Sequence, residues 1–490
     1  MDNKKKIVSS KKNTKKALVK DTTKYKILVG AIITFTVVLC GGYLVHQTGL
    51  PAAVLTGATV AGESVKVNEL NYHFTEVYNM YVQYGILTSK ADLAKVYDET
   101  TGQTYNDYLY GIAAQNQQNI ILLNKEAKKA GYVAVAAAKQ ADDYIVTLRE
   151  YAKTNNTTAD KVLQSQYGRG LSVRDLKRFM TDELAAQEYT AYLKQTSYTL
   201  TEAEMQAMYE AAPSDYDTVT FNSFLISAGY DTTATDAQKA DAVTLAGEQA
   251  QAILDASTDG QSFHDAAEAA AGTDGANSFA DGADPTIYAK TSKANITSYL
   301  NTEIADYLYD DARVAGDKTV FTTDTGAYAI YFQSRQLDTD ASASYRSLLV
   351  TDTDIAAARA LAEGYQSSVT DESSFINLVK KHSDDSNTTA AGGLKTNVTA
   401  ASIATDAPTE AETALTAWLF SADRKAGDMT IIENVDGVTL YYFQKTLPSW
   451  EAALYESNAS TEYTAWYSAL AAEAANGYTL NLGTIKFATY

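Results

Sequence analysis

The chain has 490 residues and a mass of 52.9 kDa, which is too large for one hydrophobic core and predicts about two to four domains. Its 46% hydrophobic and 20% charged residues exclude wholesale disorder, and its net charge of −20 argues against nucleic acid as a partner, because an acidic chain repels phosphate. One cysteine excludes a disulfide framework, and four histidines leave little for a zinc enzyme or a Ser-His-Asp hydrolase.

The first 45 residues carry a predicted membrane anchor. Residues 1–26 contain ten lysines and two aspartates, a local charge of +8, and such flanks stay on the cytoplasmic side. Residues 27–45 are 19 residues without a charge, which span roughly 28 Å of hydrocarbon as a helix. We expect a single-pass cell-membrane protein with its bulk outside the cytoplasm and a linker at 46–62. The alternative is a cleaved signal peptide, although signal peptides usually have shorter apolar stretches, about 7–15 residues.

An all-helical module is predicted for residues 63–213. After Asn68, the expected N-cap, five apolar residues recur at helical spacing: Leu70, Phe74, Val77, Tyr78 and Tyr81. Further helices are predicted at four places: 104–130, 136–153, after Ser172, and after a capping box at Thr201. We interpret His73 as a core or surface histidine, because no partner ligand is spaced to join it.

Two copies of a β-α-β-β unit follow, at residues 217–337 and 342–447. Strands, helices and closing hairpins are predicted at 218–226, 236–256 and 317–333 in the first copy, and at 345–350, 353–368, 372–382 and 428–444 in the second. An offset of 111 residues carries Gly316-Asp317 onto Gly427-Asp428 and Gly326 onto Gly437. We expect two domains of one fold, each an antiparallel sheet packed by helices.

The chain closes with residues 448–490, which are predicted to pack on the helical module. This segment contains an amphipathic helix at about 450–475 and a β-prone tail at 478–490.

Several landmarks of the second copy occur in a fixed order. They are the strand Arg346–Val350, the run His382-Ser383-Asp384-Asp385-Ser386, the diglycine Gly392-Gly393, the helix end Trp418-Leu419-Phe420, and Gly427-Asp428. In this order they resemble a parvulin-type (PpiC, rotamase) peptidyl-prolyl isomerase domain. From about residue 60 onward, the chain is similar to the PrsA-like and SurA-like extracytoplasmic foldases. The resemblance implies an α+β multidomain protein with a SurA-N-like helical chaperone module, two tandem parvulin-like domains and a C-terminal helix.

The same resemblance implies where substrate would bind. It places a substrate groove in the second copy at Ser347, Leu349, Leu415, Phe420, Thr439 and Tyr441, with diverged equivalents in the first copy at Ser223, Leu225 and Tyr328. Active parvulins carry a histidine in the opening strand and another in the final strand, and these positions are Ser347 and Thr439 here. Only the acid is retained, as Asp385, which is the one catalytic candidate. The alternative is that Asp385 caps a loop or helix.

Loss of both histidines does not by itself exclude catalysis. Prolyl isomerisation breaks no covalent bond, so an apolar pocket that desolvates and twists the imide can lower its barrier of about 18–20 kcal/mol. We expect a membrane-anchored folding factor that binds unfolded exported polypeptides and isomerises proline bonds weakly or not at all. The alternatives are an active peptidyl-prolyl cis–trans isomerase and a non-catalytic structural or adhesive surface protein.

The 35 tyrosines fit a client-binding surface, although core packing also explains most of those in the helical module: Tyr72, Tyr78, Tyr81, Tyr84, Tyr105, Tyr108 and Tyr110. No P-loop, GxGxxG, HExxH, CxxC or GxSxG motif occurs, so we expect no cofactor and no metal. The sequence leaves the oligomeric state open.

Overall fold

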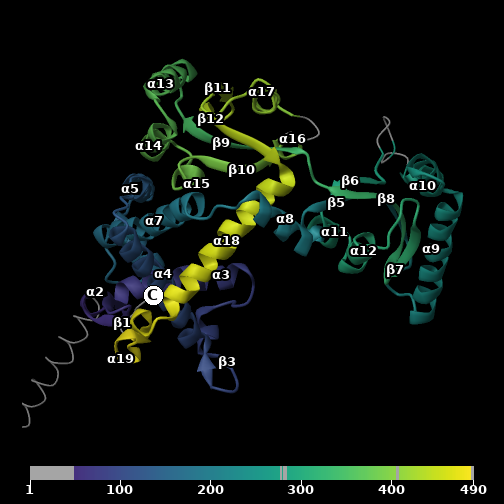
Figure 1. Ribbon diagram of the computed structural model, residues 1–490. Coiled ribbons are helices and arrows are strands. Elements are labelled where there is room, and N and C mark those ends of the chain that lie inside the picture. Colours follow the sequence, from purple (N-terminus) through teal and green to yellow (C-terminus); the bar gives the residue numbers. More distant parts are fainter. Residues whose placement is uncertain (1–48, 276–278, 280–283, 404–407, 487–490) are drawn as a thin grey trace, which may run out of the picture. The chain divides into compact units, whose positions relative to one another are not determined.

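The computed structural model describes residues 49–486 except 276–278, 280–283 and 404–407. These residues form an α+β protein with 18 α-helices and four small antiparallel sheets (Figure 1). The predicted cytoplasmic segment at 1–26 and the predicted transmembrane helix at 27–45 lie outside the described residues. Among the helices that are described, none is both long and apolar enough to cross a membrane.

The first of two compact units contains residues 49–194, 389–391 and 463–486 and is mainly helical. Its helices are α2 (Leu50–Val54), α3 (Val67–Gln83), α4 (Tyr105–Lys129), α5 (Ala136–Thr154), α6 (Ala159–Tyr167), most of α7 (Val173–Thr196) and the end of α18 (Ser449–Ala472). The helices predicted after residues 103, 135 and 172 are confirmed to within one residue. The apolar face of α3 is also confirmed, because Leu70 and Phe74 are fully buried and Phe74 stacks on Tyr110 with ring centroids 4.2 Å apart.

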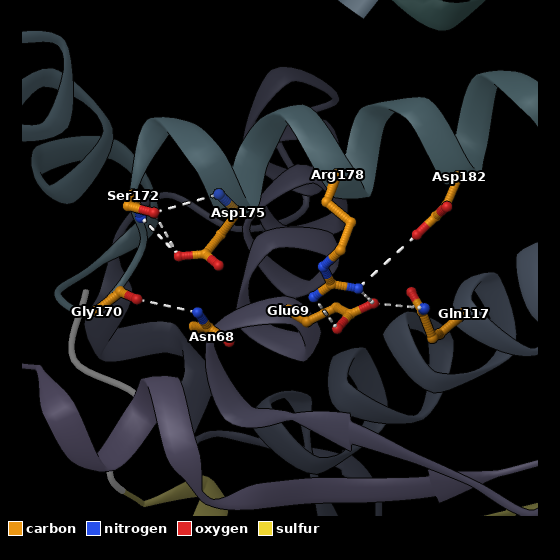
Figure 2. A network of polar contacts seen from close by, with 8 residues as sticks. All are labelled: Asn68, Glu69, Gln117, Gly170, Ser172, Asp175, Arg178 and Asp182. Atoms are coloured by element: carbon orange, nitrogen blue, oxygen red, sulfur yellow. Dashed lines mark hydrogen bonds and ion pairs between the residues drawn. The ribbon is translucent and has the colours of Figure 1, made fainter. Parts of the chain in front are cut away.

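The start of α3 differs from the prediction at Asn68. The helix begins at Val67, and no side chain caps it. Asn68 is instead buried, and its side-chain amide donates a 2.9 Å hydrogen bond to the carbonyl oxygen of Gly170 (Figure 2). Asn68 therefore ties α3 to the loop that precedes α7, and this tertiary contact replaces the expected local cap.

The first unit also contains two small sheets, so the prediction of an all-helical module is wrong in this respect. β1 (Thr56–Val60) pairs with β2 (Glu63–Lys66) and β13 (Tyr478–Leu480), and β3 (Val96–Asp98) pairs with β4 (Gln103–Thr104). The predicted linker at 46–62 likewise contains α2 and β1. Ala61 and Gly62 have positive φ angles of 47° and 80°, the geometry of a two-residue turn that closes a hairpin.

The C-terminal residues of the first unit pack on α4 and α7. Tyr463, Trp466 and Tyr467 of α18 lie against the buried cluster that these helices form, and Gln118 donates hydrogen bonds to backbone carbonyls of Ala471 and Asn476. Of the tail predicted to be β-prone, only β13 is a strand. It is followed by the one-turn helix α19 (Leu482–Ile485), and residues 487–490 lie outside the described part of the chain.

The second unit contains residues 195–388 and 392–462 and holds two four-stranded antiparallel sheets. It includes α8 (Glu202–Ala211), which opens with the predicted capping box between Thr201 and Glu204 and is followed by the 3-10 turn Pro213–Asp215. The first sheet domain comprises β5 (Asp217–Ser227), α9 (Asp236–Ala256), α10 (Gly260–Gly275), β6 (Ile287–Thr291), α11 (Lys293–Tyr299), α12 (Thr302–Leu308), β7 (Lys318–Thr323) and β8 (Gly326–Leu337). The second comprises β9 (Ala341–Val350), α13 (Ile355–Ser368), α14 (Glu372–His382), α15 (Ser386–Thr389), β10 (Leu394–Thr399), α16 (Ala400–Ile403), α17 (Glu410–Leu419), β11 (Met429–Asn434) and β12 (Gly437–Pro448).

The two sheets share strand order and register. The order is β6-β5-β8-β7 in the first and β10-β9-β12-β11 in the second. Ser223 pairs with Ile330 in the first sheet, and Ser347 pairs with Tyr441 in the second. The other residue pairs along these strands correspond between the sheets in the same way. Each sheet also has a β-bulge, at Gln333 in the first and at Gln444 in the second. The offset of 111 residues seen in the sequence therefore reappears in the hydrogen-bonding pattern.

Backbone irregularities also recur at matching places. Lys290 near the end of β6 and Asn397 in β10 are non-glycine residues with positive φ angles of 45° and 52°, and each lies at a register break against the opening strand. Gly316 and Gly427, with φ angles of 93° and 90°, lie in the turn before the closing hairpin. Such agreement in strained positions is typical of duplicated domains rather than of unrelated sheets.

Candidate functional site

The predicted groove residues of the second sheet domain lie on one face of its sheet. Ser347 pairs with Tyr441, and Leu349 pairs with Thr439, on the adjacent strands β9 and β12. Because partnered residues point to the same side of a sheet and sides alternate along a strand, these four side chains share a face. The opposite face carries Leu348 and packs in the cluster with α13 and α14.

Helix α17 packs against the part of this face that carries Tyr345 and Tyr441. Leu415 of α17 packs with Tyr441, and Phe420, directly after the helix, joins the same apolar cluster with its ring half-buried. The structure therefore places Leu415 and Phe420 beside Tyr441, whereas Ser347, Leu349 and Thr439 share with Tyr441 only the face of the sheet. Ser347 and Thr439 are each only 5% exposed, so the two positions where the family places histidine lie beneath the surface.

The groups on this face are neutral. The Thr439 hydroxyl accepts a 3.1 Å hydrogen bond from the side-chain amide of Asn434. Burial raises the pKa of Tyr441, and its hydrogen bond with Thr439 partly opposes that rise. Neither histidine of the sheet domains replaces the missing pair, since His382 stacks on Tyr365 of α13 and His264 contacts Asp284 in the first domain. The face can offer apolar contact and small hydroxyls, but no base that titrates near neutrality.

Asp385 occupies the position of a helix cap. Its carboxylate accepts a 3.0 Å hydrogen bond from the backbone N–H of Asn387 and a 2.8 Å hydrogen bond from the hydroxyl of Thr388, at the start of α15. The hydroxyl of Ser383 accepts hydrogen bonds from the N–H groups of both Asp385 and Leu349, which links this turn to β9. The geometry thus matches the capping alternative, and the bonds to α15 orient the carboxylate toward the backbone.

A cavity of about 500 Å³ opens beside the other end of β12. Leu419, Phe420, Arg424 and Phe443 are among the residues that line it. Of the predicted groove residues, Phe420 alone reaches this cavity. The guanidinium of Arg424 lies 4.4 Å from the ring centre of Trp418 and forms an ion pair with Asp428, so the rim of the cavity is rigidly held.

The first sheet domain is filled at the equivalent face. Tyr328 pairs with Leu225 as Thr439 pairs with Leu349, and its ring packs in the apolar cluster with α11 and α12. Ser223 is 5% exposed and donates its backbone N–H to the carbonyl of Thr286, whereas the Leu225 side chain is 42% exposed. A tyrosine therefore stands at the register position that Thr439 holds in the second domain.

The tyrosines of the first unit divide into core and surface groups. Tyr72 and Tyr110 are buried, so core packing explains them, while Tyr84 is 74% exposed. Four others form a ring cluster in which Tyr97 stacks on Tyr108 with centroids 3.7 Å apart: Tyr81, Tyr97, Tyr105 and Tyr108. Burial and the neighbouring Tyr108 hydroxyl raise the pKa of Tyr81 to about 12.

Exposed apolar side chains adjoin this ring cluster in the sequence. Six of them, between 38% and 74% exposed, lie at the end of α3, in the loop after it and on β3; we call them the apolar patch: Met80, Val82, Tyr84, Ile86, Val96 and Tyr97. The backbone N–H of Ile86 bonds to the carbonyl of Tyr81, and the Tyr97–Tyr108 stack ties β3 to α4. Single exposed apolar residues are ordinary, whereas exposed apolar residues that form a contiguous patch are typical of a binding surface.

His73 corrects one expectation from the sequence. Partner ligands do exist, because Glu76 follows at helical spacing and Glu183 of α7 approaches both side chains. Burial raises the pKa of Glu183, and Glu76 adds to the rise while His73 opposes it. The i, i+3 spacing of His73 and Glu76 was visible in the sequence, but nothing there indicated that α7 would bring a third group.

No model of a known protein family matches the chain, and neither does any curated protein.

Proposed function

We propose that the protein is a membrane-anchored extracytoplasmic folding factor, a chaperone or foldase of the parvulin-type class, that binds exported polypeptides and isomerises proline bonds weakly or not at all. Its helical unit would be the client-binding module, similar to that of SurA-like and PrsA-like proteins. Its two sheet domains would be tandem parvulin-like domains, the first without a free groove.

The observation that carries the proposal is the order of landmarks in the second sheet domain. Strand β9, helix α14, the diglycine, helix α17 and strand β12 follow one another as the resemblance requires. The diglycine has a physical reason, because Gly393 has a φ of 74° and a Cβ there would lie 2.2 Å from the carbonyl oxygen of Ser347. Because residue 393 is a glycine, the turn can lie close against Ser347 of β9, the position at which the family has its first histidine.

Weak isomerisation follows from what replaces the histidines. Ser347 and Thr439 lie on one face of neighbouring strands, so histidines at both positions would point to the same side of the sheet. As they stand, they supply buried hydroxyls. Catalysis would then depend on desolvation alone, within a site that is 5% exposed at both positions.

Client binding is supported by the apolar patch of the first unit. Unfolded polypeptides expose mixed apolar and aromatic side chains, and rigid tyrosine rings bind such varied surfaces with little loss of side-chain entropy. Tyr84, at 74% exposed, is the most accessible member, and Ile86 and Val96 follow at 52% each.

Aggregation and isomerisation assays on the purified full-length protein test the proposal. We expect it to suppress aggregation of a chemically unfolded protein and to accelerate prolyl-peptide isomerisation little or not at all. Tyr84→Ser with Ile86→Ser should weaken the suppression, whereas the matched control Val133→Ser with Tyr151→Ser, also exposed in the first unit, should not.

Two results would replace the proposal. Isomerisation at rates typical of active parvulins would make the protein chiefly an enzyme. Absence of both activities would favour the structural or adhesive alternative.

A further inference from the structure

Three potential metal ligands converge inside the first unit. α3 supplies His73 and Glu76, and α7 supplies Glu183; one ligand atom from each lies within 4.8 Å of the other two. The Nδ1 atom of His73 is 3.6 Å from a carboxylate oxygen of Glu76. His73 is only 2% exposed, and its ring has no hydrogen-bond partner among the described residues.

The three residues line a cavity of about 540 Å³ between α3, α4 and α7, which is bordered by the side-chain amides of Asn116 and Asn119. Two carboxylates therefore face a shared space together with a histidine. The nearest cation along α7 that lines the cavity is Lys194, eleven residues after Glu183 and so roughly 16 Å further along the helix axis. Among the described residues that line the cavity, Lys194 is the only lysine or arginine, so a bound cation would add positive charge beside the two carboxylates.

The helices that carry the ligands are fixed by a separate polar network (Figure 2). Glu69, one turn before His73 on α3, accepts 2.9 Å hydrogen bonds from Gln117 of α4 and from Arg178 of α7. Arg178 also approaches Asp182, the residue before Glu183, at 3.8 Å. Ligands on rigid, cross-linked helices keep their geometry better than ligands on loops.

The donor set indicates the class of ion. One imidazole nitrogen and two carboxylates suit first-row divalent transition metals, whereas Ca²⁺ and Mg²⁺ prefer oxygen ligands alone. In a tetrahedral zinc site with bonds of 2.0–2.1 Å, neighbouring ligand atoms are about 3.3 Å apart. The His73–Glu76 separation is already close to this value, and rotation of the flexible Glu183 side chain would bring in the third ligand. A fourth position would face the cavity and remain open to water or to another ligand.

We propose that His73, Glu76 and Glu183 bind one divalent transition-metal ion, with Zn²⁺ as the first probe, and that this ion bridges α3 and α7. The proposal is independent of the folding-factor function. An ion at this place would stiffen the helical unit directly beneath the segment of α3 that leads to the apolar patch.

Metal binding is measured on the tag-free, full-length protein after treatment with a chelator. Competition of the protein with a chromophoric chelator for Zn²⁺ should give one tight site per chain. At a Zn²⁺ concentration one hundred times the dissociation constant, the melting temperature of the first unit should rise by roughly 5–10 °C. Co²⁺ in place of Zn²⁺ should produce visible absorption typical of nitrogen and oxygen ligands.

Glu183→Gln and His73→Gln test the ligands. Each should lower the Zn²⁺ affinity by more than the roughly 100-fold that loss of an outer-shell partner can cost, and each should abolish the Co²⁺ spectrum. The matched controls are Glu150→Gln, which alters an exposed carboxylate of α5, and His264→Gln, which removes the histidine paired with Asp284; both should change affinity less than twofold. Circular dichroism shows whether the variants fold, and if His73→Gln does not, the half-buried Glu183 alone decides.

Two outcomes would overturn the proposal. One is a chain that binds neither Zn²⁺ nor Co²⁺ at micromolar concentrations. The other is stoichiometric binding that Glu183→Gln leaves unchanged, because the ion would then occupy a different site.

Discussion

Replacing Glu188 by alanine should destabilise the first unit, because this carboxylate of α7 caps α5. Glu188 is 0% exposed, and its oxygens accept hydrogen bonds from the backbone N–H groups of Val135 at 3.0 Å and Ala136 at 2.9 Å. The Tyr132 hydroxyl donates a third bond at 3.1 Å. Val135, the N-cap residue of α5, supplies no side-chain cap. Glu188 therefore accepts hydrogen bonds from backbone N–H groups that have no acceptor within the helix.

The expected loss can be bounded from both sides. A hydrogen bond to a charged group contributes roughly 1.5–3 kcal/mol, so the two backbone bonds give a gross loss of about 3–6 kcal/mol. Alanine, however, no longer buries a charge, and that relief offsets part of the loss. Losses of about 0.5–2 kcal/mol on removing an ordinary N-cap set the lower bound. We expect about 3 kcal/mol, which lowers the melting temperature of such a unit by roughly 6–12 °C.

Calorimetry of the full-length protein measures this change. Glu188→Gln should cost about half as much, because the amide oxygen still accepts one N–H while the NH₂ group cannot accept the other. Glu150→Ala removes an exposed carboxylate from α5 itself and serves as the matched control. Hydrogen exchange should accelerate at the first turn of α5 in the Glu188 variants only. A Glu188→Ala protein that melts within about 2 °C of the wild type would refute the reasoning.

Three further predictions concern the sheet domains and the loop after α3. Ser347→His with Thr439→His should raise prolyl-peptide isomerisation above wild type if the rest of the groove is intact; an unchanged rate would show that it is not. Gly393→Ala should lower the free energy of unfolding by about 2–3 kcal/mol, because its Cβ would lie 2.2 Å from a backbone oxygen. The control Gly364→Ala in α13 meets no atom within 4 Å and should be neutral or stabilising in thermal melts. The Lys95 ammonium, with donors from Thr88 and Ser89, holds the pKa of Asp92 well below its usual range. Asp92 should therefore contribute stability above its unfolded pKa of about 3.9 that is lost as the pH falls toward its folded pKa, and Asp92→Asn should flatten this dependence in acid-unfolding curves.

Local signals in the sequence were sufficient where a helix or hairpin carries its own boundary. The capping box at Thr201, the apolar face of α3 and the turn before Gly326 each mark an element that the structure contains. The 111-residue offset was visible because the matching residues have backbone roles: glycines with positive φ and an arginine-aspartate pair 3.1 Å apart in each copy. Such residues stay alike because the fold requires them.

Contacts between distant segments were not predictable in the same way. β13 pairs with β1 across more than 400 residues, and a strand of three residues has no pattern of its own. The sequence suggested that Asn68 caps the helix. Its actual partner, the carbonyl oxygen of Gly170, lies 102 residues away and could not be inferred from local sequence. The cluster of three potential metal ligands was not predictable for the same reason, since Glu183 joins His73 and Glu76 only through the packing of α7 on α3. The strand pattern was sufficient to put Ser347, Leu349, Thr439 and Tyr441 on one face of the sheet, but the packing of α17 beside Tyr441 is a contact that a single sequence does not specify.

The two copies agree where the backbone is constrained and differ at the face where substrate would bind. Tyr328 and Thr439 occupy the same register position, and the tyrosine ring packs against α11 and α12. The first domain therefore shows that this fold accommodates a tyrosine at the position of Thr439. Thr439→Tyr should leave the second domain folded and should lower its affinity for a proline-containing peptide at least about tenfold, because a bulky ring would replace the small hydroxyl on this face.

Peptide-induced NMR shifts measure that affinity, and a thermal melt verifies folding. Tyr328→Thr is the reciprocal variant and should not alter binding to the second domain. If Thr439→Tyr is folded and binds the peptide as the wild type does, clients do not use this face, and capture would have to be assigned to the apolar patch of the first unit alone.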